Sequence, residues 1–93
     1  MSEYRVFETA GFRRDLDELG SEVSGRIRAT LQSRAYPVLR VTPRQAPGAA
    51  RLRDWDPPTW RLRIGSWRIF YEIHDENRIV FLTAASHRKE AYR

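Results

Sequence analysis

The sequence contains no cysteine, and it has only two histidines and one methionine in 93 residues. The absence of cysteine excludes disulfide bonds and thiolate metal sites, and two histidines without an acidic cluster beside them give no basis for a metal site. No apolar run is long enough to cross a bilayer, and the first ten residues lack the apolar segment of a secretory signal. We therefore expect a cytoplasmic protein with no bound metal, no small-molecule cofactor and no membrane contact.

The net charge of +5 is confined to the second part of the chain. Residues 1–39 contain six arginines and six acidic residues, whereas residues 40–93 contain ten arginines, one lysine and six acidic residues. Arginine binds phosphate groups through paired hydrogen bonds, so this distribution suits a polyanionic partner. A GC-rich genome also raises the arginine content, so the excess alone proves little. With 41% hydrophobic residues, the chain is expected to form one globular domain.

The most informative segment is Trp60–Ile73, in which two alternating runs meet at Gly65-Ser66. This pattern predicts a hairpin with a two-residue type II′ turn, because glycine supplies the positive φ that the first turn position needs. The turn would pair Ile64 with Trp67, Arg63 with Arg68, Leu62 with Ile69 and Arg61 with Phe70. One face of the hairpin then carries the apolar side chains of Trp60, Leu62, Ile64, Trp67, Ile69, Tyr71 and Ile73.

The opposite face of this hairpin would be basic. It sets Arg63 directly across from Arg68, with Arg61 diagonal to Arg68, although like charges that face each other across two strands destabilise a sheet. A bound polyanion would remove this repulsion, so the pattern predicts a phosphate-binding surface. The alternative is a solvated face on which Glu72 or Asp54 neutralises the arginines.

Two helices are predicted before the hairpin. Tyr4–Glu8 alternates as a short strand, and Thr9 can cap a helix with apolar residues at every third or fourth position, which Gly20 would end. Ser21 can cap a second helix with a similar apolar stripe. Residues Tyr36–Gly48 contain three prolines and are predicted to form an irregular connection.

The remaining segments complete a sheet. Leu52–Trp55 and the turn Asp56–Thr59 lead into the hairpin, and His74–Asn77 forms the next turn. Ile79–Ala85 is an almost continuous apolar strand, typical of a central strand covered on both faces, and the short polar tail Ser86–Arg93 follows. The order β-α-α-β-β-β predicts an α+β fold, with two N-terminal helices packed on one face of a mostly antiparallel sheet.

Four segments carry a resemblance to a known family through their joint order and spacing: Tyr4–Val6, Phe12–Leu16, Trp60–Glu72 and His87–Arg93. With these segments, the chain resembles the RelE/ParE superfamily of bacterial toxins from type II toxin–antitoxin pairs. The resemblance implies one RelE-like toxin domain over residues 1–93 and a cognate antitoxin as a partner. RelE-type members cleave messenger RNA in the ribosomal A site, whereas ParE-type members inhibit DNA gyrase and are not nucleases.

The resemblance also implies site residues. Arg68 matches the hairpin arginine of the family, Tyr92 matches its tail tyrosine, and His87 matches a tail histidine found in a subset of members. The implied catalytic residues are Arg68, His87, Tyr92 and Arg63. The implied substrate-binding residues are Arg53, Arg61, Arg88 and Lys89.

RNA cleavage without a metal requires removal of the 2′-hydroxyl proton, stabilisation of the charged phosphorane and protonation of the leaving 5′ oxygen. Arginines supply the second requirement. For the proton transfers, His87 is a candidate because histidine ordinarily titrates near neutrality, and Tyr92 is a candidate if neighbouring cations lower its pKa. We therefore expect a ribosome-dependent messenger RNA endonuclease that inhibits translation, with the ribosome and messenger RNA as partners. The alternatives are a ParE-type gyrase inhibitor and an inactive solitary member of the family.

Several aromatic residues have two interpretations. Trp55 and Trp60 could stack on bases, but their spacing favours packing in the core. Phe70 is either covered by the tail, with the ring of Tyr92 against it, or exposed for a partner. His87 is either catalytic or a surface histidine near the end of a strand.

Overall fold

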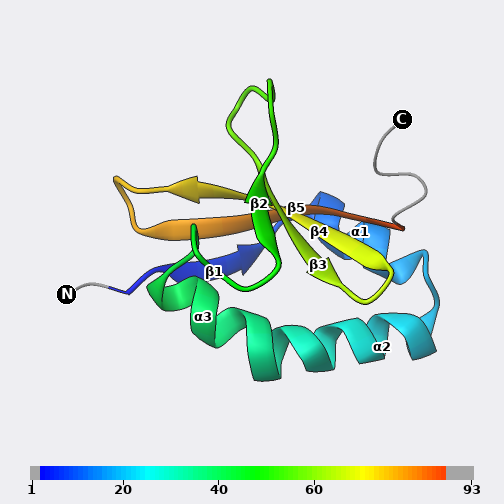
Figure 1. The fold of residues 1–93 in the computed structure, drawn as a ribbon. Helices are drawn as coiled ribbons and strands as arrows, with labels where there is room; N and C mark the ends of the chain where they lie inside the picture. The colour runs from blue at the N-terminus through cyan, green and yellow to red at the C-terminus, as the bar shows by residue number, and fades with distance from the viewer. Residues whose placement is uncertain (1–2, 88–93) are drawn as a thin grey trace.

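The computed structural model describes residues 3–87, which form an α+β fold (Figure 1). The elements are β1 (Arg5–Glu8), α1 (Ala10–Asp17), α2 (Ser21–Thr30), α3 (Tyr36–Val41), β2 (Ala49–Arg51), β3 (Trp60–Ile64), β4 (Trp67–His74) and β5 (Ile79–His87). Within these residues, five strands form one sheet in the order β1-β5-β4-β3-β2, with β1 parallel to β5 and the other neighbours antiparallel. The predicted fold class is confirmed. The edge strand β2 is an addition to the predicted order, because its Ala-Ala-Arg sequence has no alternating pattern.

The core lies between the helices and one face of the sheet. Its buried side chains come from both layers and include Phe12, Leu16, Ile27, Leu31, Leu39, Leu62, Ile69, Tyr71, Val80 and Leu82. The hydroxyl of Tyr71 donates a hydrogen bond of 2.7 Å to the carbonyl oxygen of Pro43, so the polar end of this buried ring is satisfied. None of the helices within residues 3–87 is long and apolar enough to cross a membrane.

The start of the helical layer follows the predicted capping pattern with one shift. The hydroxyl oxygen of Thr9 accepts a hydrogen bond of 3.2 Å from the backbone N–H of Phe12 and donates one of 2.9 Å to the carbonyl of Leu82. Thr9 therefore caps α1 and ties it to β5. The N-cap of α2 is Gly20, with φ of 87°, and not Ser21, which is the first helical residue. Only glycine adopts this φ without strain.

The helical layer continues where Tyr36–Gly48 was predicted to be irregular. A π-helical turn, Leu31–Ala35, joins α2 to α3, and within it the N–H of Tyr36 donates to the carbonyl of Leu31. Pro37 lies in the first turn of α3, but the helical run is continuous from α2 through the π turn. Its missing N–H and its ring would therefore disrupt a regular α-helix at this point. The wider π turn before it accommodates the proline, so the helix runs on to Val41. The prediction was wrong for residues 36–41.

The hairpin has the predicted register. Ile64 pairs with Trp67, Arg63 with Arg68, Leu62 with Ile69 and Arg61 with Phe70. Gly65 has φ of 57°, the positive value that the predicted turn requires.

Strand β5 is longer and less covered than predicted. It lies between β1 and β4 and it continues to His87, so Ser86 and His87 belong to the strand and not to the predicted tail. A bulge interrupts its pairing with β4, and the hydroxyl of Thr83 donates a hydrogen bond of 3.2 Å to the carbonyl of Phe70 there. Val80 is buried on the helix side, whereas Phe81 on the other side is only half-buried. The strand is therefore central in the sheet but covered fully on one face only.

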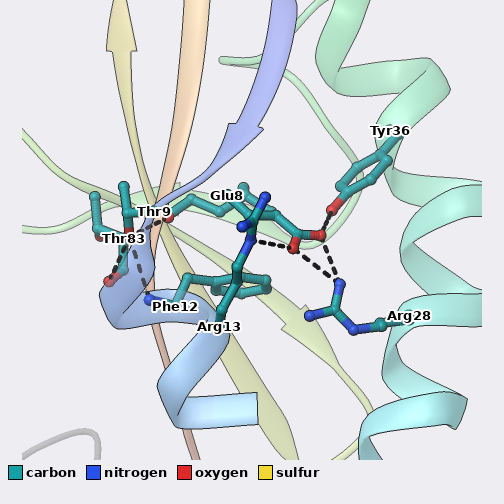
Figure 2. A network of polar contacts seen from close by, with 8 residues as sticks. Glu8, Thr9, Phe12, Arg13, Arg28, Tyr36 and Thr83 are labelled. Carbon is teal, nitrogen blue, oxygen red and sulfur yellow. Dashed lines mark hydrogen bonds and ion pairs between the residues drawn. The ribbon is translucent and has the colours of Figure 1, made fainter. Parts of the chain in front are cut away.

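A polar network joins the end of β1 to all three helices (Figure 2). One carboxylate, that of Glu8, accepts hydrogen bonds of 2.8 and 2.9 Å from Nη1 of Arg28 and of 2.7 Å from the hydroxyl of Tyr36. Nε of Arg13 lies 3.5 Å from the same group. Burial raises the pKa of Glu8, but the hydrogen bonds and charges of Arg28, Tyr36 and Arg13 outweigh it and hold the pKa below its ordinary value of 4.5.

The substitution Glu8→Gln tests this network. It should lower the free energy of unfolding at pH 7 by roughly 1–3 kcal/mol, because hydrogen bonds to charged groups are of this size. The pKa of Glu8 is lower in the folded state, so its stabilisation is present above about pH 4.5 and is lost as the pH falls through the folded value. Urea denaturation at several pH values should show the parent and the variant converging in acid. Glu76→Gln, at an exposed turn position, is the matched control. Equal stabilities at pH 7 would contradict this role of Glu8.

Candidate functional site

The sheet face that points away from the core carries the basic residues of the hairpin. Arg61 and Arg63 lie on β3, and Arg68 lies on β4 directly opposite Arg63. Phe70 lies on β4 opposite Arg61, and Ser86 of β5 flanks Arg68 on its other side. These five residues are called the arginine face below. Helices α2 and α3 lie on the opposite side of the sheet (Figure 1).

The three arginines differ in exposure. Arg63 is exposed, Arg61 is half-buried, and Arg68 has only 8% of its surface accessible. Glu72 and Asp54 were the alternative neutralising partners of the arginines. The carboxylate of Glu72 instead lies 3.0 Å from Nε2 of His74, and no ion pair links Arg61 or Arg63 to an acid within residues 3–87. The positive charge of these two arginines is therefore not neutralised by a neighbour in the described part of the chain.

Trp55 is not in the core, contrary to the preferred interpretation of its spacing. It lies in the loop between β2 and β3 and has 49% of its surface exposed. Its indole stacks on the ring of Phe70, with 5.8 Å between ring centroids and 13° between the ring planes. Phe70 is therefore buried beneath Trp55, with 7% of its surface accessible, and is not an exposed anchor. The other tryptophan, Trp60, packs against the core as expected.

His87 lies on the other side of the sheet from the arginines. It pairs with Trp67 of β4, and successive residues of a strand point to opposite faces. Its ring meets the indole of Trp67 edge-on at 4.9 Å, and Trp67 packs against the core. Ser86, not His87, has the position beside Arg68. The structure therefore does not bring His87 together with Arg63 and Arg68, as a shared catalytic role would require.

The remaining candidates lie at the edge of the arginine face or beyond the described residues. Arg53 follows β2 and lines a shallow hollow of about 480 Å³ together with Arg51, Leu52, Asp54 and Trp55. Arg88, Lys89 and Tyr92 lie outside the described residues, so their predicted roles stay predictions. Within residues 3–87, no three histidine or acidic side chains gather in a way that could hold a metal ion.

The geometry has one clear chemical capacity, which is to bind an anion. Arg63 and Arg68 occupy directly opposed positions on neighbouring strands, and Arg61 lies two residues from Arg63 on the same strand. Arginines on neighbouring positions of one face can contact adjacent oxygens of one phosphate or two phosphates of a single strand. The place of Trp55 on this face was not predicted from the sequence. Its signal was local, because Trp55 stands between Asp54 and Asp56 and before two prolines, a context typical of an exposed loop.

Comparisons with known proteins agree with this architecture. A family model described as the ParE toxin of type II toxin-antitoxin system, parDE, matches residues 6–92. No curated protein sequence matches the chain. The chain is similar to a solved RelBE2 toxin–antitoxin complex from Mycobacterium tuberculosis, with 27% identity, a TM-score of 0.72 and 97% of each chain covered.

Two further solved structures share the fold. One is the archaeal RelE-RelB complex from Pyrococcus horikoshii, with 22% identity, a TM-score of 0.60 and coverage of 98% of this chain and 100% of that chain. The other is a mutant of the Escherichia coli toxin RelE in the free state, with 23% identity, a TM-score of 0.66 and coverage of 99% of this chain and 88% of that chain. The family match extends over almost the entire sequence. The chain thus belongs to the ParE toxin family of type II toxin–antitoxin systems, within the RelE/ParE superfamily.

Proposed function

We propose that this toxin binds messenger RNA on the ribosome through the arginine face and cleaves it without a metal ion, which stops translation. The observation that carries the proposal is the pair of Arg63 and Arg68, which face each other on the uncovered side of the sheet. Like charges at directly opposed positions destabilise the free protein, so their placement is best explained by a bound anion. Arg61, and Arg53 beyond the face, extend the basic surface along an RNA strand.

In this mechanism Arg68 and Arg63 stabilise the negative charge of the phosphorane. Preorganised donors of this kind act most strongly where water is excluded, and Arg68 is already largely removed from solvent. For proton transfer we propose Tyr92, with Arg88 or Lys89 beside it, because the ring of His87 lies against Trp67 on the other side of the sheet. The proposal includes no metal, since the sequence has no cysteine and only two histidines that could act as ligands.

We also propose a cognate antitoxin that neutralises the toxin by covering the arginine face with an acidic segment. Two of the similar solved structures are toxin–antitoxin complexes. The charge excess of the chain lies in residues 40–93, which include the whole arginine face. Electrostatic attraction would make the association fast and sensitive to salt.

A second candidate function is inhibition of DNA gyrase. The observation in its favour is that the family model that matches is that of the ParE toxin. In this alternative, the arginine face would bind the surface of gyrase or the DNA bound to it, and the toxin would need no proton-transfer residue.

Induced expression in bacteria separates the two functions. We expect growth to stop because messages are cut, so primer extension on a translated message should show new 5′ ends within codons. The same message incubated with purified toxin but without ribosomes should stay intact. Unchanged messages together with accumulated gyrase–DNA cleavage complexes would support the second candidate and contradict the first.

Arg68→Leu tests whether the arginine pair serves catalysis or stability. The free energy of unfolding should stay the same or rise by up to ~1 kcal/mol, because the substitution removes a like-charge cross-strand pair. Single-turnover cleavage on ribosomes should fall by roughly 10²- to 10³-fold, as when a preorganised donor is removed. Arg26→Leu, which removes the same charge from an exposed position of α2, should change neither quantity. A large loss of stability in Arg68→Leu would identify Arg68 as a structural residue.

A pair of substitutions tests the assignment of proton transfer. His87→Ala should keep the single-turnover rate within about tenfold of the parent, whereas Tyr92→Phe should lower it by roughly 10²- to 10⁴-fold, the usual contribution of general acid–base catalysis. Tyr92→Phe preserves the ring, so a residue that only stacks would tolerate it. If His87→Ala is the variant that loses the rate, the imidazole must reach the RNA and the assignment to Tyr92 is wrong.

A further inference from the structure

The loop between β2 and β3 holds an aromatic ring over the arginine face. One face of the Trp55 indole stacks on Phe70, nearly parallel at 13°, and about half of the residue remains exposed to solvent. The loop rises on the side of the sheet opposite α2 and α3 (Figure 1). A flat π surface is therefore presented on the same side of the sheet as the arginines.

The ring is held in place by its loop as well as by Phe70. The backbone N–H of Leu52 donates a hydrogen bond of 2.9 Å to the carbonyl of Thr59, which closes the base of the loop. The side chain of Thr59, itself buried, donates one of 3.0 Å to the carbonyl of Pro57. With these constraints and a stacked neighbour, the indole has little rotational freedom to lose when a ligand stacks on it.

The surroundings of the ring are mostly charged. Arg51, Arg53 and Asp54 line the hollow beside Trp55. Arg61 lies opposite Phe70, the residue beneath the indole, and Arg68 precedes Phe70 by two positions on the same strand. A protein partner would favour a contiguous apolar patch, whereas three of the five residues that line this hollow are charged. A π face beside cations is instead the arrangement that binds single-stranded nucleic acid, where bases stack on the ring and cations contact the backbone.

We propose that Trp55 is a stacking platform for a base of the single-stranded RNA whose phosphates are bound by the arginine face. This inference rests on the proposed function and adds a substrate-positioning residue to it. The stacked base would lie on the outer side of the indole, next to Arg53 and Arg61. Stacking accepts any base, so the platform contributes to affinity and position more than to sequence preference.

Binding of a fluorescently labelled RNA octamer and of an octamer with abasic nucleotides, measured by anisotropy at low salt, tests the platform. Trp55→Ala should weaken binding of the normal octamer by about 5- to 150-fold, the range for loss of one base–aromatic stack. It should leave binding of the abasic octamer unchanged, because the phosphate contacts persist. Trp55→Phe should restore most of the affinity. Phe7→Ala is the matched control, since Phe7 is 45% exposed on the same sheet face but lies on β1.

The outcomes separate this inference from the proposed function. If Trp55→Ala binds the normal octamer like the parent, or weakens both octamers equally, the platform is wrong, and parental cleavage on ribosomes would leave the nuclease proposal standing. If the parent binds neither octamer and cuts no message on ribosomes, both proposals fail. If Trp55→Ala impairs only the binding of an antitoxin, the ring is a protein contact and the stacking inference is overturned.

Discussion

The register of the β3–β4 hairpin is the constraint on which the rest of the structure depends. Side chains alternate between the faces of a strand, so a shift of one residue would move the arginines into the core and the apolar side chains into water. Gly65, at φ of 57°, fixes the register through a two-residue turn. The same turn therefore determines both the core on one side and the arginine face on the other.

The two sides of the sheet have opposite energetic roles. On the helix side, Leu62, Ile69 and Tyr71 are buried, and the Glu8 network ties the helices to β1 (Figure 2). On the other side, Arg63 and Arg68 stand at directly opposed positions, where like charges do not favour sheet pairing. The hydrophobic core of this domain lies on its helix side, and the proposed function uses the other side. Residues of functional sites often break the local rules that the remaining sequence obeys.

Local patterns were sufficient to predict the class of fold, the hairpin register and the cap at Thr9, because each depends on neighbours in sequence. The errors have two physical origins. Residues 36–48, with three prolines, were expected to be irregular, but a local π turn before Pro37 accommodates its ring and the helix runs on to Val41. The other two errors concern contacts between segments that are distant in the sequence. Trp55 was expected in the core, but it stacks on Phe70 from a loop. The side of the sheet that His87 faces depends on strand pairing with Trp67, which the polar tail sequence does not reveal.

The central claim is that the arginine face is the surface that meets messenger RNA on the ribosome. An electron cryomicroscopy structure of the toxin on a ribosome programmed with an uncleavable 2′-O-methyl message tests it most directly. The account predicts that Arg61, Arg63 and Arg68 contact the message phosphates while α2 and α3 face away from the RNA. A toxin that is seated on the message through its helices, with the arginine face open to solvent, would contradict it.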